Sequence, residues 1–293
     1  MIKGLFVGLC TIDIQLFINE YPESNTKNKV LLSRMDIGGP AINAAITFAL
    51  LGGKARLVTM IGQHEFRNFM LDKLNERKIE VIDRIEKLKA PPVISTVISS
   101  LKSGERTILA SHLLTEKEET IEKMPEDFNI CLSDGFLAGT TKKAASITRQ
   151  SGKIVVLDGG SWKPGMKDYL THIDYAVCSS DFHPPGCNTM EEVINFLRDK
   201  QIRNIAITRG EKSIIAVVDE ERTEIRVSSI NALDTMGAGD VFHGALCYYL
   251  SGEYNFVSAL RKASYIASES CKYYGVQEWS IRSDVLAKNQ KSK

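Results

Sequence analysis

The stretch that most constrains this chain is the segment 231–246, which contains an acidic residue, a Gly-Ala-Gly turn and a second acidic residue. Small and apolar residues then follow in a helical pattern, so the glycines stand at the mouth of a helix. Glycines there let an anion approach the backbone, and free N–H groups and the helix dipole favour that anion. A carboxylate inside an anion site needs a chemical role, so Asp240 is interpreted as a base beside a phosphate. The alternative, an acid-capped helix after an ordinary glycine turn, stays open on this stretch alone.

Length and charge narrow the class of protein. The chain has 293 residues and a net charge of +1, with no long block of like charge. Such a chain can form one large α/β domain, and the charge argues against a nucleic-acid groove or a membrane-binding polybasic surface. The basic segment 288–293 is expected to be a solvated tail.

The cysteines and the apolar runs predict a cytoplasmic protein without a membrane segment. The six cysteines are scattered, with no Cys-x-x-Cys pair, which is typical of buried thiols in a reducing compartment rather than of a zinc site. The N-terminal apolar run is too short for a signal peptide, and no segment approaches the roughly 20 apolar residues that span a membrane.

Short apolar runs alternate with helical patterns along most of the chain. This order predicts an α/β fold with a central, mostly parallel sheet flanked by helices. The runs expected to form strands are 5–10, 56–61, 130–133, 154–157, 175–178 and 205–208, with an antiparallel pair at 214–218 and 223–227. The first strand is expected to deliver Asp13 at its C-terminal edge, where ligands of open parallel sheets bind.

A second glycine-rich segment, 38–53, predicts a buried helix. Gly38 and Gly39 open it, Pro40 stands at the first helical turn, and a second double glycine closes it. The alanine-rich sequence between them lacks bulky charged side chains, which indicates a helix packed inside the protein.

Two segments interrupt the α/β order. Apolar runs flank a polar stretch within 16–36, and two alternating runs lie at 93–100 and 106–110, so each segment is predicted to be a hairpin. We expect the two hairpins to pair into a small sheet outside the main one. The chain is therefore predicted to be a single domain, 1–293, with a lid formed by about 14–37 and 91–112.

The two glycine segments together resemble the signature regions of the ribokinase-like carbohydrate kinases, the PfkB family. The order of Asp13, the 38–43 segment, the lid hairpins, Thr208-Arg209-Gly210 and the 234–240 segment matches the family, and the resemblance covers almost the whole chain. It implies a ribokinase-like fold and ATP-dependent phosphorylation of a hydroxyl group on a sugar or nucleoside.

By this resemblance, Asp240 is the base that accepts the proton of the attacking hydroxyl. The backbone N–H groups of Gly237, Ala238 and Gly239 form the anion hole for the transferred phosphoryl group. Asp234 either orders this loop or nearby cations, or is a plain N-cap. Both interpretations of Asp234 stay open.

The resemblance also implies which residues bind the two substrates. Asp13 and Asn43 correspond to the sugar-hydroxyl ligands, with Gly38 and Gly39 allowing close backbone approach. For Asn43, the alternative is a role in helix packing only.

On the nucleotide side, Thr208 and Gly210 match the strand end that faces ATP in the family. ATP would bring Mg²⁺, held mainly by phosphates and waters. A monovalent cation is a further candidate.

Several features depart from other kinase patterns or from the family. No Gly-x-x-x-x-Gly-Lys-[Ser/Thr] or His-Arg-Asp motif is present, which excludes P-loop and protein kinases. Met236 replaces the usual threonine of the anion-hole loop. The family's Asn-x-x-Glu is missing near 179–183, so the metal ligand is unknown, with Asp181 or Ser180 as substitutes. His64 and His243 are expected to be a surface residue and a packing residue.

The charged residues of the lid indicate which class of acceptor the protein binds. Arg34 and Arg106 are its only arginines, whereas a sugar phosphate or sulfosugar needs a cationic pocket. A neutral pentose, hexose or ketohexose is therefore favoured. Phe17 and Phe136 could form an aromatic wall, so a nucleoside acceptor stays an open alternative.

Two further expectations concern activity and assembly. Because the magnesium motif is weakened, a sugar-binding regulatory protein with little activity stays an open alternative. Exposed lid edges predict a homodimer formed through the lid.

Overall fold

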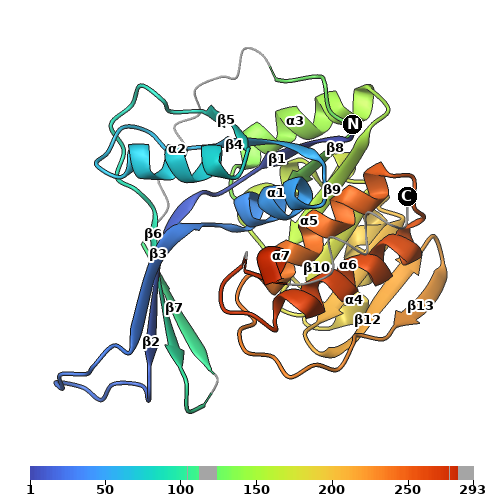
Figure 1. Cartoon of the computed structure of the whole chain (residues 1–293). Helices are drawn as coiled ribbons and strands as arrows, with labels where there is room; N and C mark the ends of the chain where they lie inside the picture. The colour runs from blue at the N-terminus through green and yellow to red at the C-terminus, as the bar shows by residue number, and fades with distance from the viewer. Residues whose placement is uncertain (104, 112–123, 277, 283–293) are drawn as a thin grey trace.

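The computed structural model of the chain describes residues 1–103, 105–111, 124–276 and 278–282. The main sheet contains β1 (Lys3–Val7), β4 (Lys54–Thr59), β5 (Glu80–Asp83), β8 (Ile130–Ser133), β9 (Ile154–Gly159), β10 (Tyr175–Ser179), β11 (Asn204–Arg209), β12 (Lys212–Val218) and β13 (Glu221–Ile225). Its nine strands lie in the order β13-β12-β11-β10-β9-β8-β1-β4-β5 (Figure 1).

The main sheet is parallel from β5 to β11, and only β12 and β13 run antiparallel to their neighbours. Its inner strands are buried on both faces, which explains why they appear as unbroken apolar runs. The predicted mostly parallel sheet is confirmed, as is the antiparallel pair at its edge. The edge strand β5 was not predicted, because Glu80 and Asp83 at its ends interrupt the apolar pattern.

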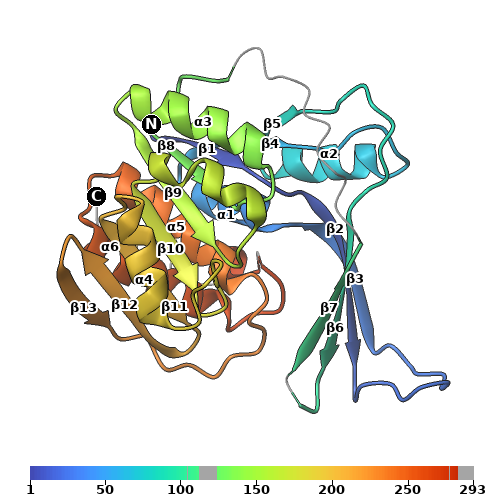
Figure 2. The ribbon, with the colours of Figure 1, turned by 180° about the vertical axis from the view of Figure 1, so that it is seen from behind.

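Helices cover both faces of the main sheet. They are α1 (Pro40–Leu50), α2 (Arg67–Glu76), α3 (Ala138–Gln150), α4 (Met190–Asp199), α5 (Ala238–Ser251), α6 (Phe256–Ser270) and α7 (Trp279–Arg282), with 3₁₀ turns η1 (Pro164–Asp168) and η2 (Leu170–His172). Helices α1, α5 and α6 lie over one face (Figure 1), and α3 and α4 lie over the other (Figure 2). None of the helices among the described residues has both the length and the apolar character that crossing a membrane requires.

Helices α1 and α5 approach each other closely, and glycine makes this possible. A Cβ added at Gly244 would lie 2.3 Å from the carbonyl oxygen of Ala44 and 2.7 Å from Cβ of Thr47. Gly39, the N-cap of α1, has φ 111°, a conformation that favours glycine, and Pro40 follows at the first helical position. The predicted buried helix is thus present, and its first turn lies beside the first turn of α5.

The lid is a four-stranded sheet of β2 (Thr11–Ile18), β3 (Leu32–Gly38), β6 (Ile94–Ser100) and β7 (Arg106–Ala110), in the order β3-β2-β6-β7. Figure 1 shows it projecting away from the helices and the main sheet. Strand β2 runs antiparallel to β3 and parallel to β6, so the two predicted hairpins do pair into one small sheet.

Asp13 does not lie where the sequence predicted. Strand β1 ends at Val7, and Asp13 is the third residue of the lid strand β2. The chain leaves the main sheet at Gly8, where an added Cβ would lie 2.2 Å from the carboxylate of Asp134. The apolar run continued past this turn, so the sequence pattern alone merged the end of one strand with the start of the next.

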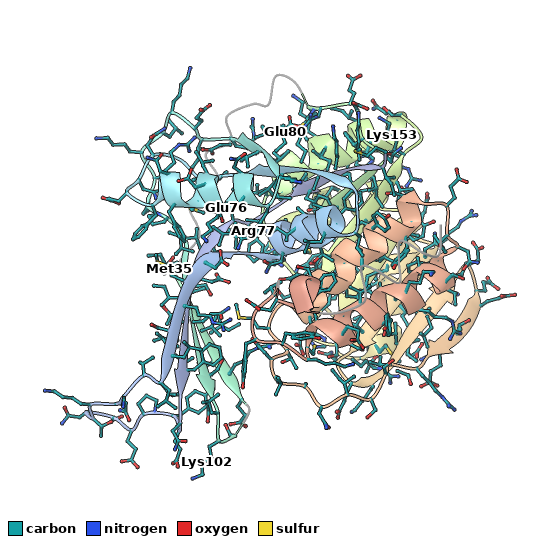
Figure 3. The ribbon with its side chains drawn as sticks, in the orientation of Figure 1. Met35, Glu76, Arg77, Glu80, Lys102 and Lys153 are labelled. Carbon is teal, nitrogen blue, oxygen red and sulfur yellow. The ribbon has the colours of Figure 1, made fainter. Side chains whose placement is uncertain are left out.

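An ion pair joins the lid to the main body. Nη2 of Arg77, at the end of α2, donates to both carboxylate oxygens of Asp36 in β3, at 2.9 and 2.7 Å. Figure 3 shows Arg77 near the base of the lid, with Met35 on the adjoining lid strand.

Candidate active site

The centre of the candidate site is Asp240, in the first turn of α5. The N-cap residue Gly237 has φ 67°, the left-handed conformation that glycine adopts without strain. Nδ2 of Asn43, on α1, donates a hydrogen bond to Oδ2 of Asp240 at 2.8 Å. The two glycine segments, almost two hundred residues apart in the sequence, therefore meet side chain to side chain.

The surroundings of Asp240 favour its neutral form. Burial raises the pKa of Asp240 from its ordinary value to about 7, and the negative charges of Asp158 and Asp134 act in the same direction. The hydrogen bond from Asn43 and the charge of His243 lower the pKa again. A carboxyl group that titrates near neutral pH suits a general base, because it can both take up and release a proton.

Backbone N–H groups lie directly before Asp240. The first turn of a helix leaves N–H groups without intrahelical acceptors. The space beside Gly239 is open, since a Cβ added there would meet no atom within 4 Å. The N–H of Ala238 donates to the carbonyl oxygen of Thr235 at 3.3 Å, a long hydrogen bond. An anion can therefore reach this turn from the side of Gly239.

Asp234 fastens the loop that carries these groups. Its Oδ1 accepts from the N–H of Met236 at 2.9 Å, and its Oδ2 accepts from the N–H of Gly275 at 2.9 Å. The N-cap of α5 is Gly237, so no N-cap side chain bonds to the first turn of this helix. Asp234 therefore bonds to two backbone N–H groups while Gly237 is the N-cap, and its role toward ATP or cations stays a prediction.

The lid side of the site contains Asp13. Its Oδ1 accepts a hydrogen bond from Oγ1 of Thr11 at 2.6 Å, and burial followed by the charge of Asp36 raises its pKa. A Cβ at Gly38 would lie 2.0 Å from Oδ2 of Asp13, so a larger residue there would displace the Asp13 carboxylate. Gly39 is equally confined, because a Cβ would lie 2.4 Å from the carbonyl oxygen of Leu9.

Asn43 has an unused hydrogen-bond acceptor. Its Oδ1 is buried and has no hydrogen-bond partner among the residues that the structure describes. Buried polar atoms normally find a partner, so a lone acceptor next to Asp240 fits a ligand hydroxyl group. This geometry goes beyond the helix-packing alternative for Asn43.

The strand-end residues Thr208 and Gly210 lie farther along the main sheet. Oγ1 of Thr208 donates to the carbonyl oxygen of Cys178 at 3.4 Å, and Gly210 has φ 63° in the turn between β11 and β12. Nε of Arg209, between them, donates to the carbonyl oxygen of Ser213 at 2.8 Å. Among the residues that the structure describes, no hydrogen bond joins them to Asp240, so they would contact a different part of a nucleotide.

Four further ionisable residues gather around the site: Asp134, Asp158, Lys163 and His243. Of these, only His243 was assigned a role from the sequence, that of a packing residue. Asp134 accepts from the N–H groups of Leu9 at 2.8 Å and Ala41 at 3.3 Å, and so ties the start of α1 to the end of β1. Burial raises the pKa of Asp134 to about 6. The signal for both aspartates was their place after a predicted strand, but strand-end position alone does not distinguish a structural acid from a functional one.

The lid rests on the loop before Asp240. Nη1 of Arg106 donates to Oγ1 of Thr235 at 2.7 Å, and Nε2 of Gln15 donates to Sδ of Met236 at 3.0 Å. Nη1 of Arg34 donates to the carbonyl oxygen of Tyr274 at 3.2 Å. Both lid arginines are thus engaged with the protein itself.

The metal ligand is still unassigned. In the part of the chain that the structure describes, no three His, Cys, Asp or Glu side chains lie close enough to hold a metal ion. Ser180 and Asp181 are exposed after β10, where the N–H of Asp181 donates to Oγ of Ser179 at 3.0 Å. An exposed carboxylate there is an oxygen donor of the kind that Mg²⁺ prefers.

Comparison with known proteins identifies the family. The model for the pfkB family carbohydrate kinases matches residues 1–283. A deoxyribokinase from Salmonella typhi is 23% identical over 291 residues, which covers 92% of this chain and 93% of that protein. A ribokinase from Dictyostelium discoideum is 22% identical and covers 92% of this chain and 95% of its own length.

Solved structures share the fold. A putative ribokinase from Agrobacterium tumefaciens superposes with a TM-score of 0.84 at 22% identity, covering 99% of this chain and 96% of that one. A ribokinase from Arabidopsis thaliana, solved with ribose and ATP, superposes with a TM-score of 0.77 at 17% identity, covering 99% and 98%. The chain therefore belongs to the PfkB family of carbohydrate kinases, phosphotransferases that act on an alcohol group.

Proposed function

We propose that this protein transfers the γ-phosphoryl group of ATP to a hydroxyl group of a small neutral sugar. The observation that carries this proposal is the contact between Asn43 and Asp240 at the open N-terminal turn of α5. Asp240 accepts the hydroxyl proton as the sugar oxygen bonds to the γ-phosphorus and the bond to ADP breaks. The N–H groups of Gly237, Ala238 and Gly239 stabilise the charge on the phosphoryl oxygens.

The sugar is held between the lid and α1 in this proposal. Asp13 and Oδ1 of Asn43 accept hydrogen bonds from sugar hydroxyl groups, and the confined glycines 38 and 39 let the sugar approach the backbone. A neutral acceptor is favoured because Arg34 and Arg106 already donate to Tyr274 and Thr235. The relatives named ribokinase and deoxyribokinase support a pentose.

The nucleotide side rests on Thr208, Gly210 and the loop that Asp234 orders. Mg²⁺, when bound, neutralises charge on the transferring phosphates. It would be held mainly by phosphates and waters, with Ser180 or Asp181 in the place of the missing Asn-x-x-Glu. The same proposal places a monovalent cation next to the Asp234 loop.

The proposal also includes the organisation of the protein. The chain forms a single domain with a lid at about 14–37 and 91–112. Two copies form a homodimer through their lids, and the protein is located in the cytoplasm.

Phosphorylation assays across an acceptor panel test the proposal. The purified protein is given ATP and Mg²⁺ with ribose, 2-deoxyribose, fructose or glucose, and in parallel with adenosine or fructose 6-phosphate. We expect ADP release above the no-acceptor background for at least one neutral sugar, with a phosphorylated sugar as product. Turnover only with adenosine or only with fructose 6-phosphate would contradict the neutral-sugar assignment.

The competing proposal is a sugar-binding regulatory protein with little activity, and the altered magnesium motif favours it. Isothermal titration with the same sugars separates the two. Sugar binding without any ADP release, at any Mg²⁺ concentration, would support the regulatory protein and contradict the kinase.

A further inference from the structure

Next to the proposed base lies a buried histidine that the proposed reaction does not use. His243 lies on α5, one helical turn after Gly239 and Asp240, and only 5% of it is exposed. Its Nδ1 lies 2.8 Å from the carbonyl oxygen of Gly239, and its Nε2 lies 3.2 Å from the carbonyl oxygen of Val177 in β10.

Both ring nitrogens of His243 face carbonyl oxygens. A carbonyl oxygen accepts hydrogen bonds and cannot donate them, so a hydrogen bond at each nitrogen requires a proton on each nitrogen. A neutral ring would place one nitrogen lone pair against a carbonyl lone pair inside the protein. The geometry therefore suits an imidazolium cation.

A carboxylate lies beside this ring. Oδ2 of Asp158, at the end of β9, is 3.5 Å from Nδ1 of His243, and both side chains are buried. The other oxygen of Asp158 accepts from the N–H of Gly160 at 3.1 Å, which holds the carboxylate in place. Buried charges occur in proteins when they are paired in this way.

The charges around the pair come from several elements. Asp134 follows β8, Asp240 shares α5 with His243, and Lys163 lies next to η1. Burial keeps the nearby thiols of Cys178 and Cys247 in their neutral form by raising their pKa. Asp134 and Asp158 thus add negative charge around Asp240, and His243 lies on the same helix as Asp240.

We propose that His243 is a positioning residue: as an imidazolium paired with Asp158, it holds the Gly239–Asp240 peptide in place and offsets the negative charge that surrounds the base. Its hydrogen bond to Gly239 anchors the peptide that joins the anion hole to Asp240. Its positive charge keeps Asp240 able to lose its proton near neutral pH. This inference rests on the proposed function, in which Asp240 is the base.

The first test does not depend on activity. The full-length protein is labelled with ¹⁵N-histidine, and the His243 ring signals are assigned by their loss in His243→Gln. At pH 7 we expect both ring nitrogens of His243 to show the shift of protonated nitrogen. A pyridine-type nitrogen on His243 would overturn the imidazolium and with it the proposal.

The second test follows the pH dependence of kcat/KM with ATP and a sugar that the wild type phosphorylates. His243→Gln removes a positive charge, so the acidic limb of the kcat/KM profile should move to higher pH by about one unit. Asp158→Asn removes a negative charge, so the acidic limb should move to lower pH. The limb of the double variant should lie between those of the two single variants. His172→Gln, at the last residue of η2, is the control and should leave the acidic limb unmoved.

The outcomes separate this inference from the proposed function. Loss of kcat in both single variants with an unmoved limb would show a merely structural role and overturn the proposal. Should His243→Gln fail to fold, the nearly isosteric Asp158→Asn still decides: an unmoved acidic limb in this variant would overturn the proposal. If the wild type phosphorylates no sugar, the proposed function fails, while the NMR result continues to test the protonation of His243.

Discussion

At the scale of single residues, opposing effects of burial, charge and hydrogen bonding determine the pKa of Asp240. Burial, Asp158 and Asp134 favour its neutral form, whereas Asn43 and His243 favour its carboxylate. The balance places its pKa at about 7. An isolated aspartate would be ionised at any physiological pH, so the surroundings convert an always-charged side chain into one that responds to pH.

The first prediction concerns the pH dependence of this base. A general base must be deprotonated to act, so kcat/KM should fall as pH drops below about 7 and approach a tenfold loss for each further pH unit. The measurement is kcat/KM between pH 5.5 and 8.5 in buffers of constant ionic strength. A flat profile down to pH 5.5 would show that Asp240 keeps an ordinary pKa.

The second prediction concerns Asn43. Asn43→Ala removes a hydrogen bond to Asp240 and an acceptor for the sugar, so kcat/KM for the sugar should fall by about ten- to a hundredfold. The KM for ATP should hardly change. Asn204→Ala is the matched control. Asn204 is the first residue of β11, at the end of the strand opposite to Thr208, and its amide donates to the carbonyl oxygen of Asp174. Equal losses for sugar and ATP would contradict a role in sugar binding.

At the scale of elements, the meeting of α1 and α5 builds the site. Asn43 and Asp240 can touch because Gly244 lets α5 lie against Ala44 and Thr47. The glycine that matters for this geometry therefore lies about one turn beyond the anion-hole glycines and faces α1.

The third prediction follows from this close approach. Gly244→Ala places a Cβ against α1, so we expect a loss of about 1–3 kcal/mol in the free energy of unfolding and slower turnover. Denaturant unfolding and kcat measure the two effects. Gly252→Ala, at the C-cap of α5, is the control, because its Cβ would make only ordinary contacts. Equal effects of both substitutions would show that helix propensity, rather than the contact with α1, is responsible.

The sequence was informative about elements where a single physical constraint dominates. Fully buried strands appear as apolar runs, and helix ends carry glycine and proline, so the main sheet and α1 were predictable. The position of Asp13 was not, because the turn at Gly8 depends on the space that Asp134 occupies. The Asp158–His243 pair was also missed, since it forms between two elements whose distance no sequence pattern reports.

At the scale of the whole molecule, the lid leaves one face exposed. A row of residues crosses this sheet in register, Met35–Ile14–Thr96–Leu109. At the two edges of the row, Met35 is 46% exposed and Leu109 is 58% exposed. Exposed apolar side chains on edge strands favour association with another sheet.

The fourth prediction follows from this surface. The wild-type protein should elute as a dimer of its 32.6-kDa chain, and Met35→Lys with Leu109→Lys should shift it to the monomer. Light scattering after size exclusion measures the mass. Leu88→Lys, on an exposed loop of the main body, is the matched control. A monomeric wild type at micromolar concentration would contradict association through the lid.

The most direct test of the whole account is the Asp240→Asn variant, which keeps the size of the side chain but removes the base. We predict that its rate of phosphoryl transfer falls by about a hundredfold or more, because an amide cannot accept the hydroxyl proton. Its affinity for ATP, measured by calorimetry, should stay close to that of the wild type. A variant that transfers phosphate at the wild-type rate would contradict the assignment of Asp240 as the base.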